Sequence, residues 1–143
     1  MVYFTEPENF DPEFEVAGCF VEHGGKILLL HRHPDKPQGG TWCLPAGKLD
    51  KGEETVQAII RETKEETGID VEPGRLEYLS KYFVVYPEFK FVYHIFKTRL
   101  DSEPNIVLSA NEHVDHRWAT PAEALSMDLI PDEDKCIKLT YGL

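Results

Sequence analysis

Four acidic side chains occur close together in the central part of this chain. Glu53 precedes a segment with helical periodicity, and Glu62, Glu65 and Glu66 lie near the end of that segment. At about 100° per residue, the last three carboxylates project from one region of the helix surface. Like charges three or four residues apart destabilise an isolated helix by ~0.2–0.5 kcal/mol per pair, and carboxylates in the last turns oppose the helix dipole. A divalent cation among them would offset this repulsion, so the pattern indicates a metal site.

The ligand types favour particular ions. The helix supplies carboxylate oxygens and no histidine, a donor set that suits Mg²⁺, with Mn²⁺ as the second choice, better than zinc. The alternative interpretation is a solvated acidic face, which is the ordinary role of an acidic run on a helix. The cluster alone does not separate the two interpretations.

The complete spacing of the segment favours the metal site. It runs Gly47, five residues, Glu53, seven residues, Arg61-Glu62, two residues, Glu65-Glu66, one residue, Gly68 and Ile69. This spacing matches the Nudix box, and on that match the chain resembles the Nudix hydrolases. One position departs from the family pattern, because Thr63 stands where a bulky aliphatic residue is usual. Its methyl group can still pack on the buried side of the helix, and no charged position of the box is missing.

The resemblance implies roles for the charged residues of the box. Glu62 and Glu66 are expected as direct metal ligands. Glu65 is expected to complete a second metal site or to hold metal-bound water. Arg61 is expected to pair with Glu53 and so fix the loop against the helix.

The resemblance also implies contributions from outside the helix. The backbone carbonyl of Ala46 is expected as a further metal ligand. The pattern of Glu112-His113, four residues and Trp118 resembles the end of several nucleotide-hydrolysing members, in which the glutamate returns to the metal site. The alternative for Glu112 is an exposed loop acid. The general base is Glu65 or Glu112, since the family takes it from different places.

Three residues are expected to bind substrate. Arg32 ends a strand and Lys48 follows the first box glycine, and both resemble the cations that meet substrate phosphates in MutT-like members. The alternative is that both are ordinary surface cations. Tyr86 lies 17 residues beyond Ile69, near the place where dinucleoside polyphosphate hydrolases carry a tyrosine.

The activity implied by the resemblance is hydrolysis of a nucleoside diphosphate linked to another moiety. The preferred substrate is a nucleoside triphosphate, cleaved to the monophosphate and pyrophosphate. The alternatives are a dinucleoside polyphosphate, ADP-ribose or a sugar nucleotide. A non-catalytic nucleotide-binding module is a further alternative, although such modules typically lose a box glutamate and this chain keeps all four.

Composition restricts the partners. The 143 residues, 41% hydrophobic and 29% charged, are typical of one globular domain. A net charge of −11 argues against binding long nucleic acid, which needs a basic surface.

The sequence contains neither an apolar run near 20 residues nor a signal sequence, so we expect no membrane contact and a cytoplasmic location. Three cysteines without a CxxC pair predict neither disulfides nor structural zinc. The oligomeric state stays open.

The elements that must position these residues follow from periodicity. A helix is expected over residues 55–67, burying a stripe of Val56, Ile59, Ile60 and Thr63 and ending at Gly68. Strands are expected over residues 14–22, 26–33, 75–86, 89–100 and 116–119, and further helices after Thr120 and over residues 132–139.

The resemblance covers nearly the whole chain. It implies one domain over residues 1–143, an α/β/α sandwich with a mixed β-sheet between helices. Residues 1–13 are expected to form either a loose arm or a lid packed on that domain.

Overall fold

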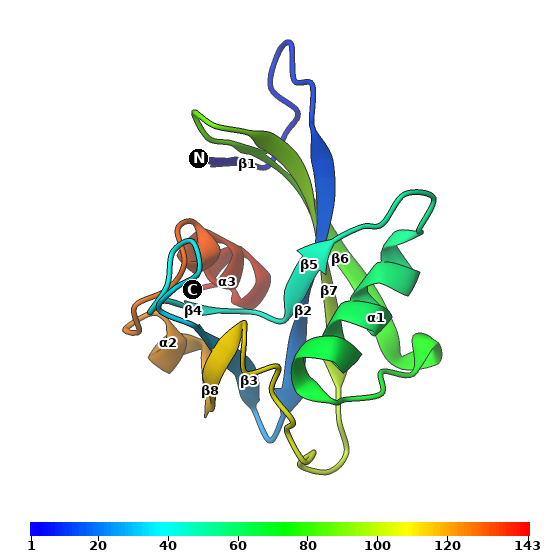
Figure 1. Cartoon of the computed structure of the whole chain (residues 1–143), viewed down its shortest axis with the longest axis vertical. Coiled ribbons are helices and arrows are strands. Elements are labelled where there is room, and N and C mark those ends of the chain that lie inside the picture. Colours follow the sequence, from blue (N-terminus) through cyan, green and yellow to red (C-terminus); the bar gives the residue numbers. More distant parts are fainter.

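A mixed eight-stranded β-sheet lies between helices in the computed structural model, which describes residues 1–143 (Figure 1). Helix α1 (Thr55–Thr67) covers one face of the sheet, and α2 (Pro121–Ala124) and α3 (Glu133–Tyr141) lie on the other. The predicted α/β/α sandwich is therefore confirmed.

The sheet combines parallel and antiparallel pairs. Its order is β1-β6-β7-β2-β3-β4, with β5 paired to β2 and β8 to β3. The β2–β7 pair is parallel, and the other pairs are antiparallel. The strands are β1 (Val2–Tyr3), β2 (Phe14–His23), β3 (Lys26–Arg32), β4 (Trp42–Cys43), β5 (Ala46–Lys48), β6 (Leu76–Val85), β7 (Lys90–Arg99) and β8 (His113–Ala119), and a 3₁₀ turn covers Pro73–Arg75.

The central strands bury both of their faces. Side chains alternate across a strand, so Phe20 and Leu29 enter the cluster that includes residues of α3, while Cys19 and Leu28 enter the cluster beneath α1. The leucine run of β3, residues 28–30, is fully buried.

Helix α1 has the predicted bounds but a different buried face. Ile59 and Thr63 are fully buried as expected, whereas Val56 is 38% exposed and was wrongly assigned to the stripe. The buried face continues through Glu66, which is only 5% exposed. The helix therefore directs the carboxylate of Glu66 toward the sheet, whereas the carboxylates of Glu62 and Glu65 lie at the margin of the buried face.

Several other boundaries differ from the prediction. Strand β8 begins three residues early, at His113, because it pairs with β3 from Arg32 to Ile27 with a bulge between His31 and Arg32. Helix α3 begins at Glu133, since Asp132 takes the left-handed conformation with φ 71°. Within residues 1–13, Val2 and Tyr3 form β1 beside β6, and Val2 is buried.

All three cysteines, Cys19, Cys43 and Cys136, are free and buried. None of the helices has the length and apolar character needed to cross a membrane.

Candidate functional site

Strand β5, which precedes α1, holds the buried carboxylate of that helix. The backbone N–H of Ala46 donates to Oε1 of Glu66 at 2.9 Å. Strand β5, which contains Ala46, is itself held against β2 through the pair Gly18–Ala46. The sheet therefore fixes the position of the Glu66 carboxylate through a backbone hydrogen bond.

The first box glycine makes room for a second carboxylate. A methyl group added at Gly47 would overlap the carboxylate of Glu62. The side chain of Glu62 is 14% exposed and accepts a hydrogen bond from Arg61 at 2.8 Å. Glycine is thus required at position 47 because the Glu62 carboxylate approaches it closely. Its backbone conformation is not the reason, since Gly47 does not have a positive φ.

Arg61 joins the loop to the helix. Its Nε and one terminal nitrogen donate to the two oxygens of Glu53, each at 2.9 Å. A terminal nitrogen also donates to the carbonyl of Lys48 at 3.1 Å. This paired contact lowers the pKa of Glu53 to about 2, so Glu53 is ionised at neutral pH. The geometry agrees with the expected pairing of Arg61 and Glu53.

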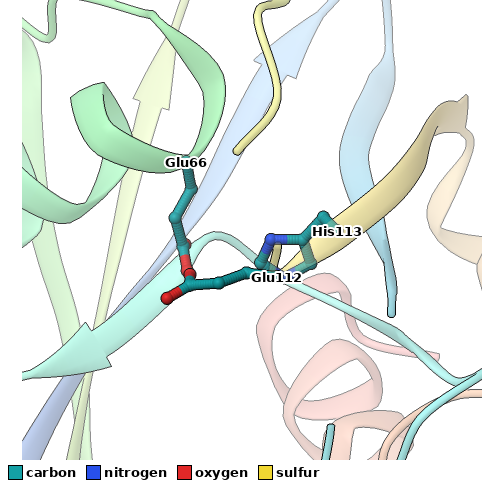
Figure 2. Close-up of side chains that lie close together, drawn as sticks. All are labelled: Glu66, Glu112 and His113. Atoms are coloured by element: carbon teal, nitrogen blue, oxygen red, sulfur yellow. The ribbon is translucent and has the colours of Figure 1, made fainter. Parts of the chain in front are cut away.

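Glu112 and His113, at the start of β8, approach the carboxylate of Glu66. Figure 2 shows the side chains of Glu66, Glu112 and His113 directed toward one another, from α1, from the turn before β8 and from the first residue of β8. One potential ligand atom of each lies within 4.8 Å of the others. The fold therefore brings Glu112 beside the box helix although it lies 46 positions after Glu66 in the sequence.

The donor set fits a divalent cation. Nδ1 of His113 is buried and has no hydrogen-bond partner, while Nε2 lies 3.7 Å from the Cys43 sulfur. Burial raises the pKa of Glu66 well above its usual value, and the repulsion of Glu62 and Glu112 adds to this effect. Burial also lowers the pKa of His113, which keeps a free lone pair on the ring. A cation bound here would accept the lone pair of the unpaired nitrogen and would offset the repulsion between the carboxylates.

Glu65 lies apart from this cluster. Its side chain is 58% exposed and contacts Arg61 at 3.3 Å, and it is not among the three residues whose ligand atoms converge. The expected part of Glu65 in metal binding or base catalysis therefore stays a prediction.

A cavity of about 250 Å³ is lined by Glu66 and His113 and by the expected substrate residues. Arg32, Lys48 and Tyr86 all contribute to its wall, together with Ala46 and Glu66. The guanidinium Nε of Arg32 donates to the carbonyl of Pro37 at 2.9 Å, and Nζ of Lys48 lies 4.2 Å from the centre of the Phe14 ring. The three residues proposed from the sequence for substrate binding thus share one cavity with Glu66.

Two residues of this cavity were not singled out from the sequence. His113 is the neighbour of Glu112 in the quoted pattern, but its convergence with Glu66 depends on the pairing of β8 with β3. Glu133 is buried at the start of α3 and lines the same cavity. An acid in the first turn of a helix is ordinarily exposed, so no local signal indicated its burial.

Comparisons with known proteins identify relatives that are similar over most of this chain. The CTP pyrophosphohydrolase of Escherichia coli K12 is 33% identical over 119 residues, which cover 82% of this chain and 83% of that protein. The solution structure of the E. coli ORF135 protein has a TM-score of 0.77 at 27% identity, covering 96% of this chain and 95% of the other. A MutT NUDIX hydrolase crystal structure from Burkholderia pseudomallei has a TM-score of 0.77 at 25% identity, covering 87% and 95%.

The family match spans most of the molecule. The family model described as NUDIX domain matches residues 12–140, a range that includes the box, the Glu112 turn and most of α3. On this match, and on the relative that is similar over four fifths of its length, the chain belongs to the NUDIX domain family.

Proposed function

We propose that this protein hydrolyses a nucleoside triphosphate to the monophosphate and pyrophosphate, with Mg²⁺ as the cofactor and Mn²⁺ as a substitute. The family assignment supports an enzyme that acts on nucleotide pyrophosphate bonds. The observation that carries the proposal is the single cavity lined by the cations Arg32 and Lys48 and by Glu66 and His113, two of the residues that converge with Glu112.

The residues have distinct roles in this proposal. Glu62 and Glu66, with the carbonyl of Ala46, would hold the metal, and Glu112 would join them. When bound, a divalent cation neutralises phosphate charge and lowers the pKa of a coordinated water. The remaining groups of the chain bind the substrate, fix the ligands and accept a proton.

Phosphate binding falls to the cations of the cavity wall. Arg32 and Lys48 line the same cavity as Glu66, so an anionic phosphate chain in this cavity would meet their positive charge. The guanidinium of Arg32 is already held by the carbonyl of Pro37, which limits the freedom it loses on binding phosphate.

The proton is accepted by a carboxylate at the edge of the site. Glu112 is exposed yet close to Glu66, so it can reach both a water molecule and bulk solvent. Glu65 is the other candidate base. Arg61 and Glu53 do not take part in proton transfer in this proposal, because their paired hydrogen bonds hold the loop against α1.

A product analysis with defined substrates tests the proposal. Nucleoside triphosphates, dinucleoside polyphosphates, ADP-ribose and sugar nucleotides would be incubated with the protein and Mg²⁺, and the products separated by chromatography. We expect monophosphate and pyrophosphate from triphosphates, and no turnover after addition of EDTA. Faster cleavage of one of the other classes would assign that substrate instead, and binding without cleavage of any class would favour the non-catalytic module.

A further inference from the structure

A histidine outside the metal site is hydrogen-bonded on both sides of its ring. His94 of β7 is 6% exposed. Its Nδ1 lies 2.6 Å from the hydroxyl oxygen of Tyr78 on β6, and its Nε2 lies 2.7 Å from Oε1 of Glu15 on β2. Both separations are at the short end of the range for hydrogen bonds. Three neighbouring strands thus join a phenol, an imidazole and a carboxylate in one chain of hydrogen bonds.

This cluster of Glu15, His94 and Tyr78 faces away from the proposed substrate cavity. Val16 and Tyr93, which adjoin Glu15 and His94 along the chain, line that cavity. Successive side chains of a strand point to opposite faces of a sheet, and no residue of the cluster contributes to the cavity wall. The proposed hydrolysis therefore makes no use of these three side chains.

The phenol of the cluster is both held in place and accessible. The ring of Tyr78 packs edge-on against Phe96, with centroids 5.1 Å apart and an angle of 83° between the planes. Phe96 is 1% exposed, whereas Tyr78 is 46% exposed. The buried ring thus supports one side of Tyr78, and a small molecule can approach the other side from solvent.

The direction of the hydrogen bonds follows from the chemistry of the two ends. A carboxylate accepts hydrogen bonds and has no proton to donate, so Nε2 of the neutral His94 ring carries the proton. The lone pair of Nδ1 then accepts from the hydroxyl of Tyr78. Burial raises the pKa of Tyr78, and the charge of Glu15 adds to this effect. The phenol therefore keeps its proton at neutral pH, and Nδ1 of His94 is placed to remove it.

These contacts match those of an activated nucleophile. A hydroxyl within hydrogen-bond reach of a base, with that base oriented by a third group, is the arrangement used in nucleophilic catalysis, and tyrosine is among the side chains that form covalent intermediates. Glu15 orients the ring of His94 and stabilises the positive charge that the ring gains when it takes a proton. The cluster therefore contains a nucleophile, a base and an orienting group.

We propose that Tyr78 is a nucleophile activated by His94 and Glu15, and that activated esters acylate it. The Tyr78 oxygen attacks the carbonyl carbon of the ester while its proton passes to Nδ1 of His94. The tetrahedral intermediate then breaks the bond to the leaving oxygen, which takes the proton from His94. The products are an acyl ester of Tyr78 and the free alcohol or phenol, with no change in oxidation state.

Charge favours an uncharged acyl donor over a phosphoryl donor. The net charge of −11 repels phosphate esters where no metal ion intervenes. Lys81 stands opposite His94 in the register of β6 and β7, so it lies on the same face of the sheet as the cluster. Its ammonium can approach the negative charge that forms on the carbonyl oxygen during attack.

The test uses p-nitrophenyl acetate, which is uncharged and releases a coloured phenolate. After incubation with the protein, the acetyl groups would be located by mass spectrometry of proteolytic peptides. Tyr3, which is 39% exposed, is the internal reference, because the structure pairs Tyr78 and not Tyr3 with a histidine. The variants are Tyr78→Phe, His94→Gln and Glu15→Gln, with Tyr3→Phe as the matched control. Circular dichroism and melting would show that each variant is folded.

The expected result is selective acetylation of Tyr78. In the parent, Tyr78 should react about 100-fold faster than Tyr3, since general-base catalysis contributes roughly 10²- to 10⁴-fold. His94→Gln should lower the rate at Tyr78 toward that at Tyr3, and Glu15→Gln should also slow it, because the base loses the group that orients it. Tyr78→Phe should remove the fast release of phenolate, and Tyr3→Phe should keep it.

Two results would overturn the proposal. One is equal acetylation of Tyr78 and Tyr3 in the parent, and the other is an unchanged ratio of the two rates in folded His94→Gln. If His94→Gln does not fold, an unchanged ratio in Glu15→Gln overturns the proposal instead, since the Glu15 side chain is 49% exposed and its replacement leaves the packing intact.

This test is independent of the proposed hydrolysis. No metal takes part in the acylation, so the rate at Tyr78 should be the same with and without EDTA, and a rate that falls in EDTA would overturn the proposal. Tyr78→Phe should hydrolyse nucleotides as the parent does, because Tyr78 lies outside the cavity wall. Selective acetylation of Tyr78 in a protein that hydrolyses no nucleotide would support this inference and overturn the proposed function.

Discussion

Gly47→Ala is expected to damage the metal site while leaving the fold intact. The added methyl group would overlap the carboxylate of Glu62. That carboxylate is the far end of a flexible side chain, so it moves more easily than the backbone of β5. The backbone of Gly47 has no positive φ, so alanine is tolerated there in all respects except this contact.

The magnitudes separate stability from activity. Replacing glycine by alanine at an unstrained position stabilises by about 0.4–1 kcal/mol, and turning Glu62 off its rotamer costs about 0.5–1.5 kcal/mol. These changes nearly cancel, so we expect a shift in Tm of about 4 °C or less. Loss of correct ligand orientation typically lowers metal affinity or activity by about 10- to 100-fold, equivalent to about 1.4–2.7 kcal/mol.

The assay measures kcat/KM for triphosphate hydrolysis at several Mg²⁺ concentrations, with Tm recorded in EDTA. Gly74→Ala is the control, because a methyl group at Gly74 meets nothing within 4 Å. We expect Gly47→Ala to lose activity and to recover part of it at high Mg²⁺, and Gly74→Ala to behave as the parent. Parent-like activity of Gly47→Ala, or a loss in Tm far above 4 °C, would refute the reasoning.

Three further variants test separate parts of the site. Glu66→Gln should keep the hydrogen bond from Ala46 and the fold but lose most turnover, since an amide is a poor ligand for a hard cation; near-normal kcat would remove Glu66 from the ligands. Glu112→Gln should lower kcat by roughly 10²- to 10⁴-fold if Glu112 is the base, with little change in Tm because the side chain is exposed, whereas a parent-like kcat would leave Glu65 as the candidate. Glu133 holds its proton to a higher pH in the folded state, about 7 against 4.5, so its contribution is complete below pH 4.5 and falls by up to about 3 kcal/mol as pH rises through 7. Denaturant unfolding across that range should show a flatter profile for Glu133→Gln, and identical profiles would contradict the assignment.

Local signals were sufficient for the box helix. Periodicity and the stop at Gly68 predicted α1 with its observed bounds, and Gly68 takes the left-handed conformation expected of such a residue. The buried face was predicted less well, because the apolar Val56 is exposed and the charged Glu66 is buried. A carboxylate points inward there because the Ala46 N–H binds it, which a helical periodicity cannot reveal.

Long-range placement came from family resemblance and not from local pattern. The approach of Glu112 to Glu66 depends on the antiparallel pairing of β8 with β3 and on the bulge at His31–Arg32. Nothing in the residues around Glu112 specifies that pairing. The burial of Glu133 was missed for the same reason, since its partners Leu44 and Tyr93 lie 89 and 40 residues away.

The proposed activity requires one metal centre formed by α1 and the turn before β8. Titration of the nucleotide-free protein with Mn²⁺, followed by the paramagnetic resonance signal of the free ion, measures that binding. We expect the parent to bind Mn²⁺ in competition with Mg²⁺, and Glu66→Gln and Glu112→Gln each to weaken binding by about tenfold or more. Equal Mn²⁺ affinity in the parent and both variants would contradict the assignment of these carboxylates to a metal site.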